Sequence, residues 1–134
     1  MSEEDEYPKD LKYTKEHEWA RIDGKIVTVG ITKYAAEQLG DITQVDLPKE
    51  GETVRKNDVL GTVESVKAVS DIYAPISGKI VKVNTPLGDT PEYLSDDPYD
   101  EGWMVQLEAT NEAELAELMD AKAYADFVSE GDEH

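Results

Sequence analysis

The residue best suited to chemistry in this sequence is a lysine between two runs of residues that favour β-strands. Lys67 lies within the segment GTVESVKAVSD at 61–71, with Glu64 three residues before it and Asp71 four residues after it. Because β-branched residues flank it on both sides, the pattern places Lys67 at the turn of a hairpin. A tight turn directs its central side chain into solvent, where a modifying enzyme can reach the ε-amine. The pattern therefore permits covalent modification of Lys67, or a lysine that is simply solvated.

Few other residues in the chain could do chemistry. The 134 residues include no cysteine, which excludes disulfides, thiol nucleophiles and cysteine-based metal sites. His17 has acids on both sides, but His134 is the only other histidine, so we expect a structural His17 and no metal site. The sequence contains no glycine-rich phosphate loop, nucleophile elbow or persuasive carboxylate pair. We therefore predict no catalytic residue.

The sequence is strongly acidic. Its 31 acids and 13 bases give a net charge of −18. Such a surface repels nucleic-acid phosphates and anionic lipids, so we expect neither as a partner. It favours partners with basic docking surfaces, or it only keeps the protein dissolved. No apolar run approaches the roughly 20 residues of a membrane span, and the acidic segment 1–6 is unlike a signal peptide, which predicts a cytoplasmic protein.

The elements that must position Lys67 are short strands. β-Branched runs between glycines and prolines predict a mainly β fold of the sandwich or barrel type. The clearest hairpin signal is Asp23-Gly24, which lies between two such runs. We expect strands at 18–22, 25–29, 43–47, 58–64, 69–73, 80–83 and 103–107.

Helical patterns are fewer. Thr32 is a suitable N-cap for a helix at 33–39, and Gly40 is a suitable residue to follow it. A second helix is expected at 111–128, because Asn111 and Glu114 match a capping box. Its apolar residues fall on one helical arc: Leu115, Leu118, Met119, Ala123 and Phe127. A short helical turn is also expected at 91–94.

These patterns predict one domain over residues 11–128. An acidic N-terminal extension at 1–10 precedes it, and a flexible tail at 129–134 follows it.

The segment around Lys67 resembles a known motif. ESVKAVSD at 64–71, followed by APISG at 74–78, is similar to the lipoyl-attachment motif of glycine cleavage H-proteins. The similarity extends to YTKEHEW at 13–19, to the segment 30–42 and to the late signature DPY at 97–99 with GWM at 102–104, and so covers residues 11–128. The resemblance implies the lipoyl/biotinyl-type hybrid barrel-sandwich of antiparallel strands, with lipoate held as an amide on Lys67.

The resemblance also implies roles for other residues. Glu64, Asp71 and Gly78 match family positions associated with recognition by the lipoylating enzyme. In the family the loaded arm folds back into a cleft, where Glu18 and Asp71 would lie near the bound amine. Gln38 stands where some members have a cleft histidine, which puts identical cleft contacts in doubt.

The function implied is that of a non-catalytic, monomeric shuttle of the glycine cleavage system. It would carry an aminomethyl group from a glycine decarboxylase (P-protein) to an aminomethyltransferase (T-protein), and electrons to dihydrolipoyl dehydrogenase (L-protein). A lipoate ligase or lipoyl transferase would attach the cofactor. The main competing hypothesis is an H-like protein that relays lipoyl groups to other enzymes.

Three more hypotheses are compatible with parts of the sequence: a lipoyl or biotinyl domain of another complex, a hydrolase that uses acidic residues, and a plain binding module. A biotin acceptor usually has methionine on both sides of its lysine, whereas Val66 and Ala68 flank Lys67 here. The residues beside the lysine therefore favour lipoate over biotin.

Overall fold

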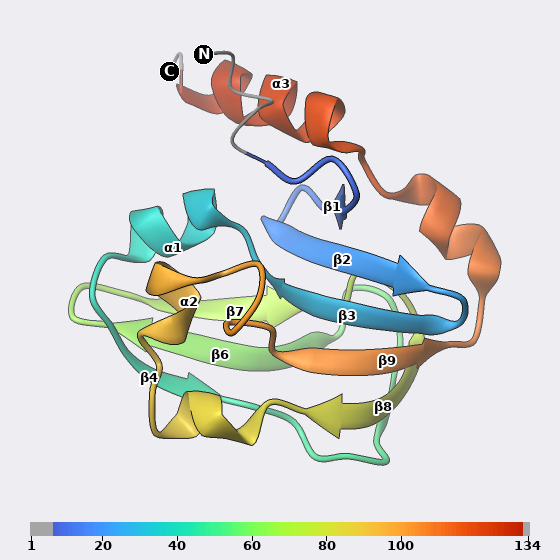
Figure 1. Cartoon of the computed structure of the whole chain (residues 1–134), viewed down its shortest axis with the longest axis horizontal. Coiled ribbons are helices and arrows are strands. Elements are labelled where there is room, and N and C mark those ends of the chain that lie inside the picture. Colours follow the sequence, from blue (N-terminus) through green and yellow to red (C-terminus); the bar gives the residue numbers. More distant parts are fainter. Residues whose placement is uncertain (1–6, 133–134) are drawn as a thin grey trace.

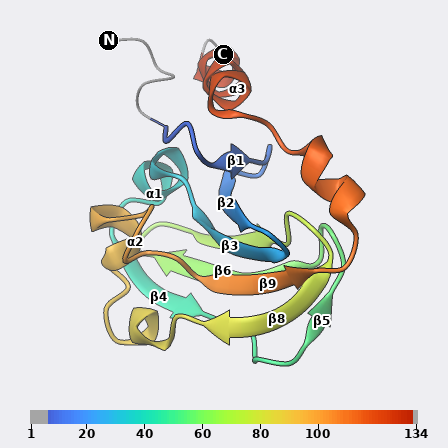
Figure 2. The ribbon, with the colours of Figure 1, turned by 45° about the vertical axis from the view of Figure 1, so that its right-hand side comes forward.

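The computed structural model of the chain describes residues 7–132. Its strands form two antiparallel sheets around a shared apolar core, with helices at their margins (Figure 1). The larger sheet has the strand order β1-β2-β3-β9-β8-β5, and the smaller sheet has the order β4-β6-β7. The mainly β antiparallel fold predicted from the sequence is thus confirmed, as two sheets and not a closed barrel (Figure 2).

Most element bounds lie close to the predicted ones. Each of the seven expected strands appears with ends shifted by at most two residues, and the helix at 33–39 is found as predicted. The larger sheet contains β1 (Lys12–Tyr13), β2 (Glu18–Asp23), β3 (Ile26–Ile31), β9 (Val105–Ala109), β8 (Gly78–Val83) and β5 (Thr53–Val54). The smaller contains β4 (Ile42–Asp46), β6 (Val59–Ser65) and β7 (Val69–Tyr73). The helices are α1 (Lys33–Leu39), α2 (Tyr93–Asp96) and α3 (Ala121–Asp132), with 3-10 helices η2 (Thr85–Gly88) and η3 (Glu112–Glu117).

Strand β2 pairs closely with its neighbour β3 in the larger sheet. Trp19 of β2 is paired in register with Gly30 of β3. A Cβ atom on Gly30 would lie only 2.7 Å from the indole of Trp19, so glycine leaves the space that this ring fills. The indole N–H donates to the carbonyl of Pro98 at 2.8 Å. The start of β2 is therefore held firmly, which matters because Glu18 is its first residue.

The single helix predicted at 111–128 is wrong, because the segment forms two helices, η3 and α3. Between them the backbone of Met119 pairs with that of Tyr13, with N–H···O distances of 2.8 Å in both directions. A residue in such a bridge is extended and cannot continue a helix. Asp120 then caps the start of α3, since its carboxylate accepts the N–H of Ala123 at 2.8 Å.

The capping box predicted at Asn111 forms only in part. Asn111 caps η3 by accepting the N–H of Ala113 at 3.2 Å. Glu114 does not reach back to Asn111. Its carboxylate instead accepts the backbone N–H of Ser77 at 2.7 Å and the Ser77 hydroxyl at 3.0 Å. The acid therefore ties η3 to the loop between β7 and β8.

Helix α3 packs on a second, aromatic cluster beyond the main sheet (Figure 1). The helix predicted to end at 128 continues through Asp132, into the segment predicted as a flexible tail. Tyr7, in the predicted N-terminal extension, is buried against this cluster. Residues 1–6 and 133–134 lie outside the described part of the chain. No helix within 7–132 is long and apolar enough to cross a bilayer. The cluster's buried members are Tyr7, Leu11, Tyr13, Trp19, Ala121, Tyr124, Ala125 and Val128.

Candidate functional site

Lys67 lies at the tip of the β6–β7 hairpin, as the sequence predicted. The turn is closed by the Ser65 N–H, which donates to the carbonyl of Ala68 at 2.8 Å. The Ser65 hydroxyl oxygen accepts the N–H groups of Lys67 at 3.3 Å and Ala68 at 3.1 Å. The Lys67 side chain is exposed, and within residues 7–132 its ammonium has no hydrogen bond or ion pair. A well-ordered turn thus presents an amine that is available for acylation.

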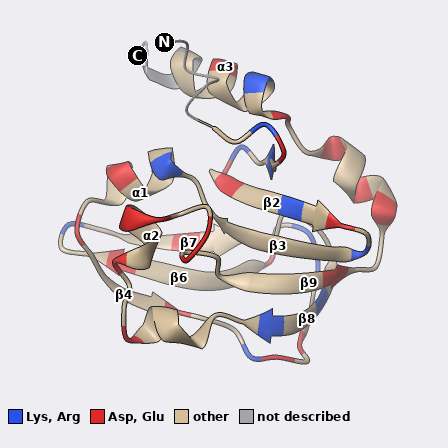
Figure 3. Ribbon diagram, in the orientation of Figure 1, with Lys and Arg blue, Asp and Glu red and all other residues tan. Residues whose placement is uncertain are grey.

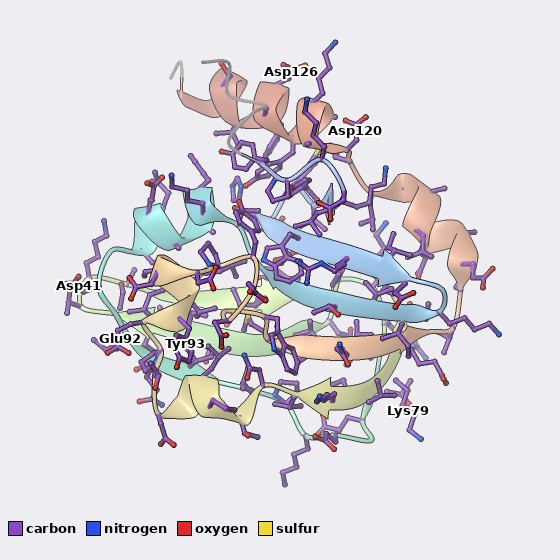
Figure 4. All side chains as sticks on the ribbon, viewed as in Figure 1. Asp41, Lys79, Glu92, Tyr93, Asp120 and Asp126 are labelled. Atoms are coloured by element: carbon purple, nitrogen blue, oxygen red, sulfur yellow. The ribbon has the colours of Figure 1, made fainter. Side chains whose placement is uncertain are left out.

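The corner between α1 and β4 supports this turn from one side. The N–H of Val66 donates to the carbonyl of Asp41 at 3.1 Å, and Asp41 lies at this end of the molecule (Figure 4). A Cβ atom at Gly40 would lie 3.6 Å from Cε of Lys67, so the lysine stem passes close to the end of α1. Gly40 has φ +78°, which favours glycine. The position of Lys67 therefore depends on α1 as well as on its own hairpin.

Exposed apolar residues flank the lysine. Val66 is 72% exposed and Val69 is 66% exposed, the highest values among the large apolar side chains of the described residues. Val66 lies next to Lys67 in the turn, and Val69 begins β7. Figure 3 shows acidic segments spread over much of the molecule. An apolar patch around an exposed amine suits docking by a modifying enzyme.

The outer face of β7 leads away from Lys67. Side chains alternate along a strand, so Val69, Asp71 and Tyr73 share one face, while Ile72 is buried on the other. Glu64 of β6 is paired in register with Val69 and therefore lies on the same face. The structure thus brings Glu64 and Asp71 to one face of the hairpin whose tip carries Lys67.

Glu18 lies beside the end of β7. Its Oε2 accepts the N–H of Tyr73, the last residue of β7, at 3.2 Å. Its Oε1 accepts the hydroxyl of Thr14 at 2.6 Å. Glu18 is only 1% exposed. Burial raises the pKa of this carboxyl to about 7, against the lowering effect of its hydrogen bonds to Thr14 and Tyr73.

A cavity of about 280 Å³ opens beside Glu18. Two of its lining residues, Lys56 and Glu117, form an ion pair at 3.1 Å. The cavity lies among the β1–β2 turn, the loops around 56–57 and 74–75, and the end of η3. It joins a buried acid to a space large enough for a small polar group.

Gly78 is the predicted site residue that does not join this face. It begins β8 in the larger sheet, paired with Val54 on one side and Ala109 on the other. A Cβ atom there would lie 2.6 Å from the carbonyl oxygen of Glu108. Glycine is needed at this position for the close approach of two strands.

Sequence reasoning missed the groups that hold the site together. Thr14 hydrogen-bonds Glu18 and Ser65 closes the lysine turn. Both lie within the motif segments 13–19 and 64–71, but the sequence predicts no role for either. The late signature at 97–99 supports the start of α1, because the Tyr99 hydroxyl accepts the N–H of Lys33 at 2.9 Å. His17 contacts Tyr124 rather than other potential ligands, and no group of three or more potential metal ligands occurs within 7–132.

Comparisons with known proteins point in one direction. The sequence profile of a family described as "Glycine cleavage H-protein" matches residues 11–131. The glycine cleavage system H protein of Anaeromyxobacter sp. (strain K) is 54% identical over 93% of this chain and 98% of its own length. That of Symbiobacterium thermophilum is 55% identical over 92% of this chain and 97% of its own. The structure also resembles the crystal structure of a glycine cleavage system H protein from Mycobacterium marinum, with a TM-score of 0.81 and 44% sequence identity. The match covers 90% of this chain and 97% of that one.

Proposed function

The chain belongs to the glycine cleavage H-protein family, and we propose that Lys67 is the residue on which it carries its lipoyl group. As a member of that family it is a non-catalytic component of the glycine cleavage system, working with P-, T- and L-proteins and with a lipoate-attaching enzyme. When bound, the lipoyl group carries the aminomethyl unit between the P- and T-proteins and passes electrons to the L-protein.

The observation that carries the assignment is the presentation of Lys67. Acylation requires a neutral amine that can leave its surroundings without breaking contacts. Lys67 meets this condition, because its amine is exposed and makes no hydrogen bond or ion pair in residues 7–132. The hydrogen bonds of Ser65 and Asp41 fix the turn beneath it. A rigid turn allows an enzyme to recognise shape without first ordering the chain.

We assign recognition by the attaching enzyme to residues around the turn. Glu64 and Asp71 lie on one face of the hairpin that ends in Lys67, where acids can meet basic groups of the enzyme. The exposed Val66 and Val69 supply an apolar contact. Gly78 supports recognition indirectly, by allowing β8 to pack closely on β9.

We assign Glu18 to the cleft that receives the load. In this proposal the load extends from Lys67 along the hairpin, past Asp71, to the Glu18 carboxyl at the end of β7. A cation there favours the ionised form of Glu18, so the acid would release its proton and pair with the ammonium of the load. Because Glu18 is buried, it also holds this end of the cleft away from bulk water.

We also propose that the protein works in the cytoplasm. The proposal is supported by its composition, with 33% charged residues and no cysteine, which suits a reducing compartment.

Peptide mass spectrometry tests the attachment site. The protein is co-expressed with a lipoate ligase in medium containing both lipoate and biotin. We expect the mass added by a lipoyl group only on the peptide that contains Lys67. This added mass should be absent in Lys67→Arg. Lys25→Arg is the matched control, because Lys25 is an exposed lysine beside another hairpin turn. An unmodified Lys67, in a preparation where a control H-protein is fully lipoylated, would refute the assignment.

A further inference from the structure

Helix α3 reaches toward the turn that carries Glu18 through one buried side chain. Tyr124 is fully buried, and its hydroxyl lies 2.7 Å from Nδ1 of His17 and 2.7 Å from Oγ1 of Thr32. Its ring is stacked on Tyr13 at 4.9 Å and meets Tyr7 edge-on at 4.9 Å. Packing on both rings fixes the hydroxyl, so the helix offers His17 a partner at a defined position.

His17 needs such a partner because its backbone is strained. Its φ is +71°, in the left-handed region that a residue with a Cβ rarely adopts. Its carbonyl accepts the N–H of Thr32 at 3.0 Å, and its own N–H donates to the carbonyl of Thr14 at 3.1 Å. The His17 ring also lies 4.7 Å from that of Tyr34 and 5.9 Å from that of Phe127. The bond to Tyr124 adds a hydrogen bond to these contacts and helps to hold the residue in this conformation.

The strained residue lies next to Glu18 in a closed turn. The Thr14 N–H donates to the Glu18 carbonyl at 3.0 Å. The Thr14 hydroxyl oxygen accepts the N–H of Glu18 at 3.2 Å, and its hydroxyl donates to the Glu18 carboxylate at 2.6 Å. A change in the backbone at His17 therefore shifts both the backbone and the carboxylate of Glu18.

We propose that Tyr124 is a positioning residue for the load-binding cleft: by bonding His17 it holds the β1–β2 turn in the form that directs the Glu18 carboxylate to the end of β7. The inference rests on the cleft role assigned to Glu18 under the proposed function. It gives α3 a part in the site, although this helix lies on the opposite side of β1 and β2 from the hairpin that carries Lys67 (Figure 1).

A spectroscopic test can be made on the protein without its lipoyl group. In the wild type the N–H of Tyr73 donates to Glu18, so its amide resonance should titrate with that carboxyl. In Tyr124→Phe we expect this titration to be lost or clearly reduced, with the sheet resonances otherwise in place. Tyr13→Phe is the matched control. It removes a hydroxyl from the same aromatic cluster, but this hydroxyl donates to the carbonyl of Pro8 and not to His17. His17→Ala breaks the same contact from the other side and should reproduce Tyr124→Phe.

A second readout uses the lipoylated, loaded protein. In Tyr124→Phe we expect lipoylation of Lys67 at the wild-type rate, but loss of the load to water about fivefold faster, the factor expected for one hydrogen bond. Glu18→Gln added to Tyr124→Phe should change the rate little further. A Tyr73 titration and a load lifetime that match those of Tyr13→Phe would overturn the proposal while leaving the carrier function standing. Failure of Lys67 to accept lipoate would refute the carrier assignment instead. An unchanged lifetime of the load in Glu18→Gln would overturn both the cleft role of Glu18 and the positioning role of Tyr124.

Discussion

Replacing Glu18 by glutamine should change how the stability of the protein depends on pH. Burial raises the pKa of Glu18 from its ordinary value of 4.5 to about 7 in the folded protein. The folded state therefore binds this proton more tightly than the unfolded state does. The resulting stabilisation is fully present below pH 4.5 and is lost as the pH rises through 7. At 1.36 kcal/mol for each tenfold change in proton affinity, the loss amounts to about 3 kcal/mol.

Glutamine removes this titration and retains most of the contacts. Its amide oxygen can accept the N–H of Tyr73, and its amide nitrogen can donate to the Thr14 oxygen. We therefore expect the free energy of unfolding of Glu18→Gln to lack the fall of about 3 kcal/mol that Glu18 contributes between pH 5 and 8. The variant should exceed the wild type in stability most clearly at pH 8.

Urea unfolding, followed by tryptophan fluorescence at several pH values from 4.5 to 9, measures this effect. Glutamine also removes one negative charge, so the comparison needs a variant with the same change in charge. Glu16→Gln provides it, because Glu16 is exposed and lies in the same turn. Glu16 also raises the pKa of Glu18 slightly, so this control should flatten the profile only a little. Parallel profiles for the wild type and Glu18→Gln would refute the reasoning.

Two further substitutions test the frame around the site. Gly78→Ala should lower the free energy of unfolding, measured by urea unfolding, by about 2 kcal/mol, because its Cβ would lie 2.6 Å from the carbonyl oxygen of Glu108. If mass spectrometry shows that lipoylation is lost while the stability is unchanged, the attaching enzyme contacts this position directly. Ser65→Ala should cost about 1 kcal/mol, speed hydrogen exchange at the Lys67 amide and raise the KM of the attaching ligase for the protein, whereas an unchanged exchange rate would show that the Ser65 hydroxyl does not order the turn.

The parts of the site that depend on neighbouring residues could be predicted from the sequence. The Lys67 turn is defined by β-branched runs directly before and after it, and the structure places it at the tip of a hairpin. The caps of α1 were predictable for the same reason: Thr32 accepts the N–H of Ala35 three residues on. In each case the residues that decide the local structure lie within a few positions of one another.

The helix predicted at 111–128 failed because a distant segment overrides its local pattern. The apolar spacing is continuous through Met119, and nothing near it in the sequence interrupts a helix. The interruption comes from Tyr13, more than a hundred positions away, whose backbone pairs with Met119. Glu114 likewise leaves the expected cap for Ser77, which lies 37 positions away. Periodicity describes which residues could share a face, but pairing across the fold decides where a helix ends.

The same distinction separates the attachment site from the cleft. Glu18 is one of 31 acids, and residue type alone does not reveal that this carboxyl is buried. It acquires its environment from Tyr73, 55 positions away, and its turn is tied to Tyr124, which lies 107 positions from His17. A carrier built in this way can lose one property without the other. Substitutions that loosen α3 should leave Lys67 a good substrate for lipoylation, because the Ser65 hydrogen bonds that close its turn lie within the hairpin itself. They should reduce protection of the load, because Glu18, which we propose receives it, is held in place from the other end of the chain.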